Sequence, residues 1–201
     1  IQKSQLGGGS PMIRGFATDR ILVVIDGVRM NNAIYRSGNL QNIISIDALG
    51  TQTAEVIFGP GSLIYGSDAI GGVMDFHTLN ARFSKEKKML FSGSALARYS
   101  TANKEHTFHA DIHLGWKKLS LLSSISYSKF DDLKMGKKGG QDSYLRPEYV
   151  ERINGIDSIV KNNNTRIQRF SGYEQINFLQ KIRYKPSEHF DLQYSFTYAG
   201  T

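Results

Sequence analysis

The second half of the chain alternates between apolar and polar residues over unusually long stretches. From Phe108 to Trp116, every second residue is apolar, and most residues between them are polar. The same alternation recurs in segments 119–128, 175–184 and 190–198 and, more weakly, in 90–100. A period of two indicates a β-strand whose two faces lie in different environments. We therefore predict about five antiparallel strands, each longer than the roughly five or six residues usual in soluble proteins.

Two architectures have strands of this kind, namely a soluble β-sandwich and a transmembrane β-barrel. Lys117–Lys118 and Lys185–His189 predict short turns, whereas residues 131–172 form a long polar connection. Short turns that alternate with long loops are typical of outer-membrane barrels. Aromatic residues also gather at both ends of the apolar faces, as rings at the two membrane interfaces would. They are Phe91, Trp116, Tyr184 and Phe190 at one end and Tyr99, Phe108, Tyr127 and Tyr198 at the other.

The first 80 residues have a different pattern. Ile21–Ile25 is a continuous apolar run that ends at Asp26–Gly27, which predicts a buried strand followed by a turn. Further short strands are expected at 54–58 and 73–79, with one helical turn after Ser62. The fold class we predict is a small α+β domain followed by antiparallel barrel strands.

Composition excludes several classes of function. Cysteine is absent, which removes disulfides and thiolate chemistry from this chain. The net charge of +7 is spread along the sequence without a recognition motif, so we expect no nucleic-acid partner. Gly61–Ser67 is spaced like a phosphate loop but lacks its lysine. No catalytic constellation stands out, and we expect neither an enzyme nor a cofactor.

One polar strand face holds a weak candidate metal site. His109, Asp111 and His113 are alternate residues of one predicted strand, so their side chains share a face. Such residues more often line a wet lumen, and our expectation is no metal site.

Three stretches near the N-terminus resemble the plug domain of TonB-dependent outer-membrane receptors. They are SPMIRGF (10–16), DRILVVIDGVRMN (19–31) and GPGSLIYGSDAIGGVMDF (59–76). The stretches look like those of receptors from Bacteroidetes-type bacteria. It departs from the family where an arginine is common before the Gly-Pro pair at 59–60, since Phe58 stands there. In the family, charges in that stretch help to dock the plug against the barrel wall, and the resemblance implies altered docking here.

The resemblance implies a plug domain at 1–80, lacking its N-terminal part, and the first about five strands of a barrel of about 22 strands at 81–201. It implies a long extracellular loop at about 131–172 and a location in the bacterial outer membrane. The implied partners are the lipid bilayer, TonB, whose contact segment would precede Ile1, and a small ligand. The implied function is active import of a scarce nutrient, foremost an iron carrier such as a ferric siderophore or haem.

The loop after the IDGV strand is where the family meets its ligand. By resemblance, the substrate-binding candidates are Arg29, Asn31, Asn32, Tyr35, Arg36 and Asn39. The arginines would suit an anionic ligand. Two alternatives stay open: import of cobalamin or a glycan by the same mechanism, and a soluble β-rich binding or adhesion domain.

Overall fold

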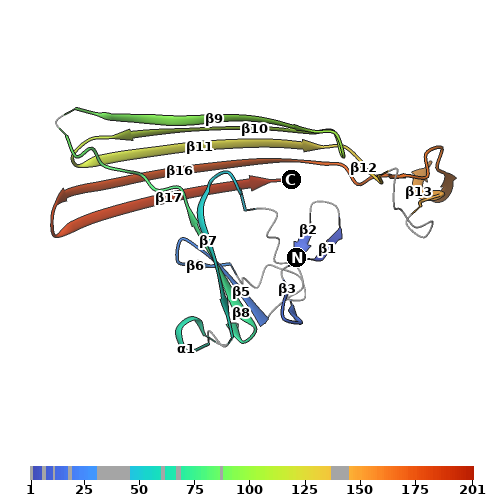
Figure 1. The fold of residues 1–201 in the computed structure, drawn as a ribbon, viewed down its shortest axis with the longest axis horizontal. Helices are drawn as coiled ribbons and strands as arrows, with labels where there is room; N and C mark the ends of the chain where they lie inside the picture. The colour runs from blue at the N-terminus through green and yellow to red at the C-terminus, as the bar shows by residue number, and fades with distance from the viewer. Residues whose placement is uncertain are drawn as a thin grey trace.

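The computed structural model describes residues 2–5, 8–10, 12–17, 20–30, 46–59, 62–66, 69–86, 88–136 and 145–201. Two sheets dominate the described part of the chain (Figure 1). We call them the small sheet, of four strands, and the large sheet, of five. One end of the small sheet points toward one face of the large sheet, and the stretch between β8 and β9 joins them.

The small sheet has the strand order β6-β5-β8-β7. β5 (Ile21–Ile25) is central and runs parallel to β8 (Gly72–Thr78). β6 (Val28–Arg29) and β7 (Thr51–Phe58) pair antiparallel to them. Four of the five β5 residues are buried, as a continuous apolar run predicts. The predicted strands and helical turn are present, the turn being α1 (Ser62–Tyr65).

The core of the small sheet is small and needs glycine at one crossing. Leu22, Val24, Ala69 and Val73 form the buried cluster. A Cβ atom on Gly71 would lie 2.5 Å from the Cβ of Phe16, and one on Gly72 would lie 2.7 Å from the carbonyl oxygen of Ile57. Only glycine lets the backbones approach this closely. Short hairpins precede the sheet: β1 (Gln2–Gln5) with β2 (Gly8–Ser10), and β3 (Met12–Ile13) with β4 (Phe16–Ala17).

The large sheet is an antiparallel meander with the order β17-β16-β11-β10-β9. Its strands have 11 to 15 residues, which confirms their predicted length. Their bounds are β9 Leu90–Ser100, β10 Glu105–Gly115, β11 Leu119–Phe130, β16 Tyr173–Ser187 and β17 Phe190–Gly200. β9 and β17 are its edges, so the sheet is open in this chain. Among the described residues, no helix is both long and apolar enough to cross a bilayer.

The two faces of the large sheet are inverted relative to a soluble protein. In β10, Thr107, His109, Asp111 and His113 are buried, whereas Phe108 and Ile112 are about half exposed. The same parity buries Ser124 and Ser126 of β11 and Lys181 of β16. The buried part of the polar face lies on β10, β11 and β16, where Asp26 and Asp47 contact it, and the apolar side chains on the other face are exposed. The apolar sides are not packed between two sheets, as a soluble sandwich would require.

Aromatic residues lie at both ends of the apolar face, as predicted, and further aromatic residues lie in its centre. All eight residues expected at the two ends are exposed. Tyr194 and Phe196 of β17, however, lie opposite Ile182 and Gln180 in the middle of the band. The apolar face therefore holds aromatic residues in its centre as well as at its ends.

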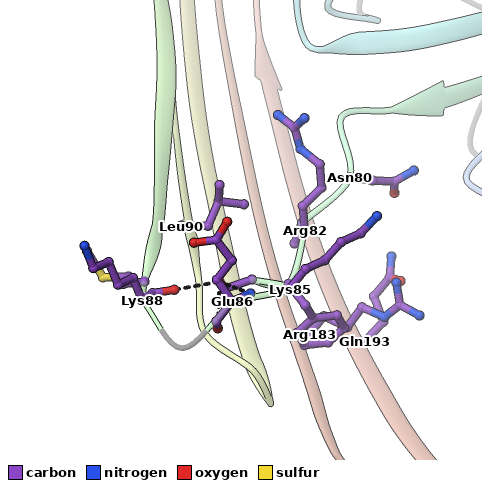
Figure 2. A pocket seen from close by; sticks show the side chains of 12 residues that line it. Asn80, Arg82, Lys85, Glu86, Lys88, Leu90, Arg183 and Gln193 are labelled. Carbon is purple, nitrogen blue, oxygen red and sulfur yellow. Dashed lines mark hydrogen bonds between the residues drawn. The ribbon is translucent and has the colours of Figure 1, made fainter.

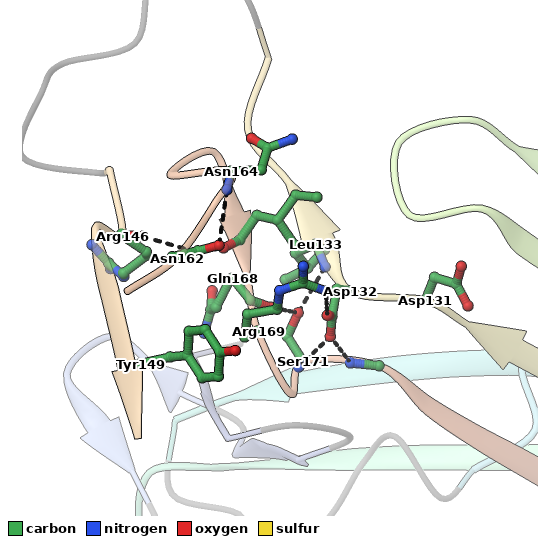
Figure 3. Close-up of polar contacts among 12 residues, drawn as sticks. Asp131, Asp132, Leu133, Arg146, Tyr149, Asn162, Asn164, Gln168, Arg169 and Ser171 are labelled. Carbon is green, nitrogen blue, oxygen red and sulfur yellow. Dashed lines mark hydrogen bonds and ion pairs between the residues drawn. The ribbon is translucent and has the colours of Figure 1, made fainter. Parts of the chain in front are cut away.

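The long connection after β11 contains structure of its own. β12 (Leu133–Lys134) pairs with β15 (Ile167–Gln168), and β13 (Glu148–Ile153) pairs with β14 (Ile156–Lys161). Figure 1 shows these strands beyond one end of the large sheet. Figure 3 shows how their base is held: the carboxylate of Asp132 accepts hydrogen bonds from the backbone amides of Ser171 and Gly172. Asn162, which is buried, donates to the carbonyl oxygens of Arg146 and Ile167.

Candidate functional site

The first contact between the two sheets starts at the predicted Asp26–Gly27 turn. Both residues have positive φ (49° and 82°), and they connect β5 to β6. The turn prediction is confirmed, but it missed a second role of the aspartate. The Asp26 carboxylate accepts hydrogen bonds from the Thr78 amide (2.9 Å) and the Thr78 hydroxyl (2.6 Å). The turn and Thr78 thereby hold the Asp26 carboxylate in a position that faces the large sheet.

Lys181 of β16 meets this carboxylate. Its Nζ lies 3.0 Å from Asp26 Oδ2, and the lysine side chain is 1% exposed. The ammonium also reaches the Thr78 carbonyl oxygen (3.5 Å) and Asn80 Oδ1 (3.4 Å). Burial alone would raise the pKa of Asp26, but the Thr78 hydrogen bonds and Lys181 outweigh it, so the pKa lies below its ordinary value. A buried ammonium needs such partners, because leaving it unpaired is costly.

A second contact lies on β10 and β11. Asp47 accepts a hydrogen bond from the Ser126 hydroxyl (2.6 Å) through Oδ2 and from the Leu49 amide (2.9 Å) through Oδ1. Ser126 Oγ also lies 2.7 Å from Nδ1 of His109. His109 Nε2 in turn lies 3.4 Å from Asp111. A continuous series of polar contacts therefore runs from Asp47, which precedes β7, into the large sheet.

The three weak candidates for metal binding, His109, Asp111 and His113, belong to this series of polar contacts. Asp111 lies between two imidazoles, with His113 Nε2 at 3.2 Å from its other oxygen. Ser94 also donates a hydrogen bond to Asp111. No group of three or more His, Asp or Glu side chains in the described part of the chain could hold a metal ion. The carboxylate is already engaged by protein donors, and the residues form a hydrogen-bonded network.

The predicted ligand residues are only in part described. Asn31, Asn32, Tyr35, Arg36 and Asn39 lie outside the described residues. Arg29 is described: it ends β6, is exposed, and its guanidinium lies about 3.1 Å from where a Cβ on Gly66 would stand. Its role toward a ligand stays a prediction.

A cationic cavity of about 910 Å³ lies where the joining stretch passes the large sheet (Figure 2). Its charged walls come from Arg82, Lys85, Glu86 and Lys88 of that stretch and from Arg183 of β16. Arg183 is held by Asp191 (2.6 Å) and lies over the ring of Phe83 (5.3 Å). The joining stretch is thus fastened to the large sheet by ring stacking as well as by the buried cluster Ala81, Leu122 and Leu179.

Comparison with known proteins identifies the small sheet and what precedes it. Residues 1–73 match the family model of the TonB-dependent Receptor Plug Domain. Residues 1–73 are therefore a TonB-dependent receptor plug domain. The chain comprises plug-domain sequence and an N-terminal part of the barrel wall. The resemblance on which the prediction was based is confirmed, while its Bacteroidetes-like character is not addressed by the comparisons.

Curated relatives agree with this family. The chain is 38% identical over 112 residues to the vitamin B12 transporter BtuB of Vibrio vulnificus strain CMCP6, which covers 54% of the chain and 17% of that protein. It is 36% identical over 109 residues to the heme/hemopexin utilization protein C of Haemophilus influenzae, covering 51% of the chain and 14% of that protein. The matched region is therefore a small part of these relatives.

Solved structures show the same fold. The copper transporter OprC matches with a TM-score of 0.70 at 16% identity, covering 98% of the chain and 26% of that protein. The FrpB iron transporter of Neisseria meningitidis (F5-1 variant) matches with a TM-score of 0.63 at 16% identity, covering 95% of the chain and 26% of that protein. The chain thus corresponds to about a quarter of each of these structures.

Family membership settles two expectations. TonB-dependent receptors are bacterial outer-membrane proteins, and they are transporters and not enzymes. The predicted location and the predicted lack of enzymatic activity are therefore confirmed. The inverted faces of the large sheet agree with this location, because apolar side chains of such a wall face lipid.

The plug–wall contacts through Asp26 and Asp47 were missed by reasoning from the sequence. Lys181 offered the available signal, as a lysine on the polar face of a predicted strand. Its partner lies in a plug turn far earlier in the chain, and alternation within one strand carries no information about such a distant contact.

Proposed function

We propose that the whole protein is a TonB-dependent importer that carries a scarce nutrient, foremost an iron carrier, across the outer membrane. In this proposal residues 1–80 form the plug and residues 81–201 form the first strands of a barrel of about 22 strands. Residues 131–172 are the extracellular loop. The proposal is supported above all by a plug-domain sequence that contacts the polar face of long strands whose apolar side chains are exposed. A wall of this kind separates lipid from a polar lumen.

The plug–wall contacts are compatible with a plug domain that moves relative to the barrel wall. Among the described residues, polar contacts such as Lys181 with Asp26 and Ser126 with Asp47 join the two parts, beside the small apolar cluster of Leu79, Ala81, Leu122 and Leu179. Polar contacts can be exchanged for water when the plug moves, whereas separating a large apolar interface would expose it. Energy for that movement would come through TonB acting from the periplasm.

Arginines in the apical loop favour an anionic ligand. Arg29 and Arg36, with Asn31, Asn32, Tyr35 and Asn39, are the proposed ligand contacts. Guanidinium groups bind carboxylates in pairs of charge-assisted hydrogen bonds, which suits a ferric siderophore or haem propionates. The heme/hemopexin relative supports this class of cargo. The vitamin B12 relative supports cobalamin as the second candidate, and a glycan is the third.

Growth of a deletion strain on single nutrients tests the proposal. We expect the strain to lose growth in iron-limited medium on one iron carrier, either a ferric siderophore or haem, and to keep growth on the other sources. Supplying the full-length gene should restore growth. A parallel culture that depends on external cobalamin separates the second candidate from the first. Unchanged growth on every iron source would contradict the assignment of an iron carrier.

A further inference from the structure

A glutamine lies in the centre of the apolar face of the large sheet. Gln180 of β16 is on this face, and the residues of β16 that share the face with it are Ile176, Phe178, Ile182 and Tyr184. About 13 Å of strand separates Gln180 from either end of this series. In the barrel of the proposed function the apolar face meets lipid, so Gln180 lies at the middle of the hydrocarbon layer.

The side-chain amide of Gln180 is only partly satisfied. Its oxygen accepts a hydrogen bond from the Ser123 hydroxyl of β11, at 2.6 Å. Its two N–H groups have no acceptor among the described residues. Exchanging the amide oxygen and nitrogen leaves an unpaired N–H group as well, because one hydroxyl oxygen meets only one of two diverging N–H groups. Neither water nor a lipid headgroup supplies an acceptor at the middle of a bilayer, where an unpaired N–H group is costly.

Aromatic residues beside Gln180 are a second sign of a protein contact. Phe196 of β17 pairs with Gln180 and is 46% exposed, and Tyr194 pairs with Ile182. Rings that anchor a barrel at the membrane interfaces belong at the two ends of the apolar face. Aromatic residues in the middle of an exposed surface are instead typical of the centres of protein–protein interfaces.

We propose that this face is an interface between two copies of the receptor, in which the two Gln180 amides donate hydrogen bonds to each other. The inference rests on the barrel of the proposed function and not on any ligand. The amide presents N–H donors, and its oxygen has a second lone pair besides the one that Ser123 engages. One side chain therefore carries both halves of a reciprocal pair, which a symmetric interface requires.

Membrane geometry favours a second copy over a different protein. Receptors in one bilayer share one orientation, so two copies are related by a two-fold axis along the membrane normal. Such an axis places each residue opposite one at the same depth, and an axis that passes β16 brings the two Gln180 side chains together. Barrel strands are tilted by roughly 35–45°, so the strands of two facing walls cross and touch mainly near the crossing point. There Phe178, Ile182 and Phe196 surround the paired amides and exclude lipid.

Energy transfer between receptors in liposomes tests this inference. The full-length receptor is labelled with a donor or an acceptor dye at an introduced cysteine, Lys161→Cys, at an exposed position of β14, and residues 1–201 contain no other cysteine. The two populations are mixed and then diluted with lipid. We expect energy transfer that falls with dilution as a monomer–dimer equilibrium requires. Adding Gln180→Leu should weaken dimerisation about tenfold, because two symmetry-related hydrogen bonds within the membrane are lost.

Control variants separate the interface from the rest of the wall. Gln193→Leu is the matched control, because Gln193 of β17 pairs with Arg183 and lies on the polar face, and this variant should dimerise like the wild type. Phe196→Ala should weaken the dimer as well, since it removes the ring beside the paired amides. Phe91→Ala should not, because this exposed ring lies on the same face but at the far edge of the sheet, on β9.

Two results would overturn the proposal. One is a wild-type receptor that stays monomeric at every lipid dilution, and the other is a Gln180→Leu receptor that dimerises as strongly as the wild type. Migration of unheated samples on denaturing gels shows in parallel whether each variant forms a closed barrel. A monomer with a closed barrel contradicts the dimer alone, whereas a wild type without a closed barrel contradicts the proposed function and the dimer with it.

Discussion

At the scale of single residues, the Asp26–Lys181 pair is the most consequential contact in the described structure. It joins a plug turn to the wall, and both groups are held by further hydrogen bonds. Phe58 pairs with Gly72 at the opposite end of β7 from the Thr78 side, and the Arg14 guanidinium lies over its ring (5.0 Å). The altered docking implied by Phe58 stays a prediction.

Breaking this pair should loosen the plug. Asp26→Asn leaves the ammonium of Lys181 buried without its counter-charge, which should destabilise the plug by about 3 kcal/mol. Asp26→Asn combined with Lys181→Met should cost less than Asp26→Asn alone, because no unpaired charge remains. Pulse proteolysis of the full-length protein in a urea series measures both. Additive costs in the double variant would contradict a direct pair.

The pair also predicts a dependence on acid. Since the pKa of Asp26 in the folded protein is below its ordinary value of 3.8, the stabilisation is complete above pH 3.8 and is lost as the pH falls through the lowered value. The same proteolysis experiment, carried into this acid range, should show the wild type approaching the Asp26→Asn variant. A constant gap between the two proteins would speak against this assignment.

At the scale of elements, the two faces of β10 lie in different environments. Its buried side chains are polar and hydrogen-bond to β9 and β11, and its exposed side chains include the apolar Phe108 and Ile112. The alternation predicted this division, and the structure assigns the two faces. A single-residue shift in register would reverse every side chain of the strand.

A pair of lysine substitutions on the two faces tests that assignment. Ile112 and Leu96 are both apolar and similarly exposed (49% and 42%), but Ile112 is on the open face and Leu96 is opposite His109 on the plug side. Ile112→Lys should destabilise the full-length protein in lipid by about 2–4 kcal/mol, whereas Leu96→Lys should cost less than about 1 kcal/mol. Urea unfolding in liposomes measures both. Equal costs would mean that the open face does not contact lipid.

At the scale of the whole molecule, the large sheet has two unpaired edges. Among the described strands, β9 and β17 each have a neighbour on one side only, and the apolar face spans the sheet between them. Open edges of this length invite pairing with other strands, and closure of a ring removes them. The remaining strands of the proposed barrel are expected to satisfy both edges.

Closure predicts a specific behaviour of the full-length protein. In outer-membrane fractions it should migrate faster on denaturing gels when left unheated than when boiled, because a closed barrel resists detergent until heated. Extraction of the protein into buffer without detergent, with no heat-dependent shift, would instead favour the soluble β-rich alternative.

The sequence by itself determined the local elements of this protein and its family. Alternation marked all five long strands because the period of two is a local property that each strand repeats by itself. The run Ile21–Ile25 marked the buried strand. Motifs within residues 10–76 were enough to recognise the plug, which the family match confirms.

Tertiary structure alone decided which side chains from distant segments meet. Asp26 with Lys181, and Asp47 with Ser126 and His109, are pairs from elements far apart in the chain. Their contact depends on how the plug is turned against the wall, and hydrophobic periodicity does not encode that orientation. For the same reason the sequence offered His109, Asp111 and His113 as a possible metal site, whereas the folded chain places them in a hydrogen-bonded network that connects wall and plug.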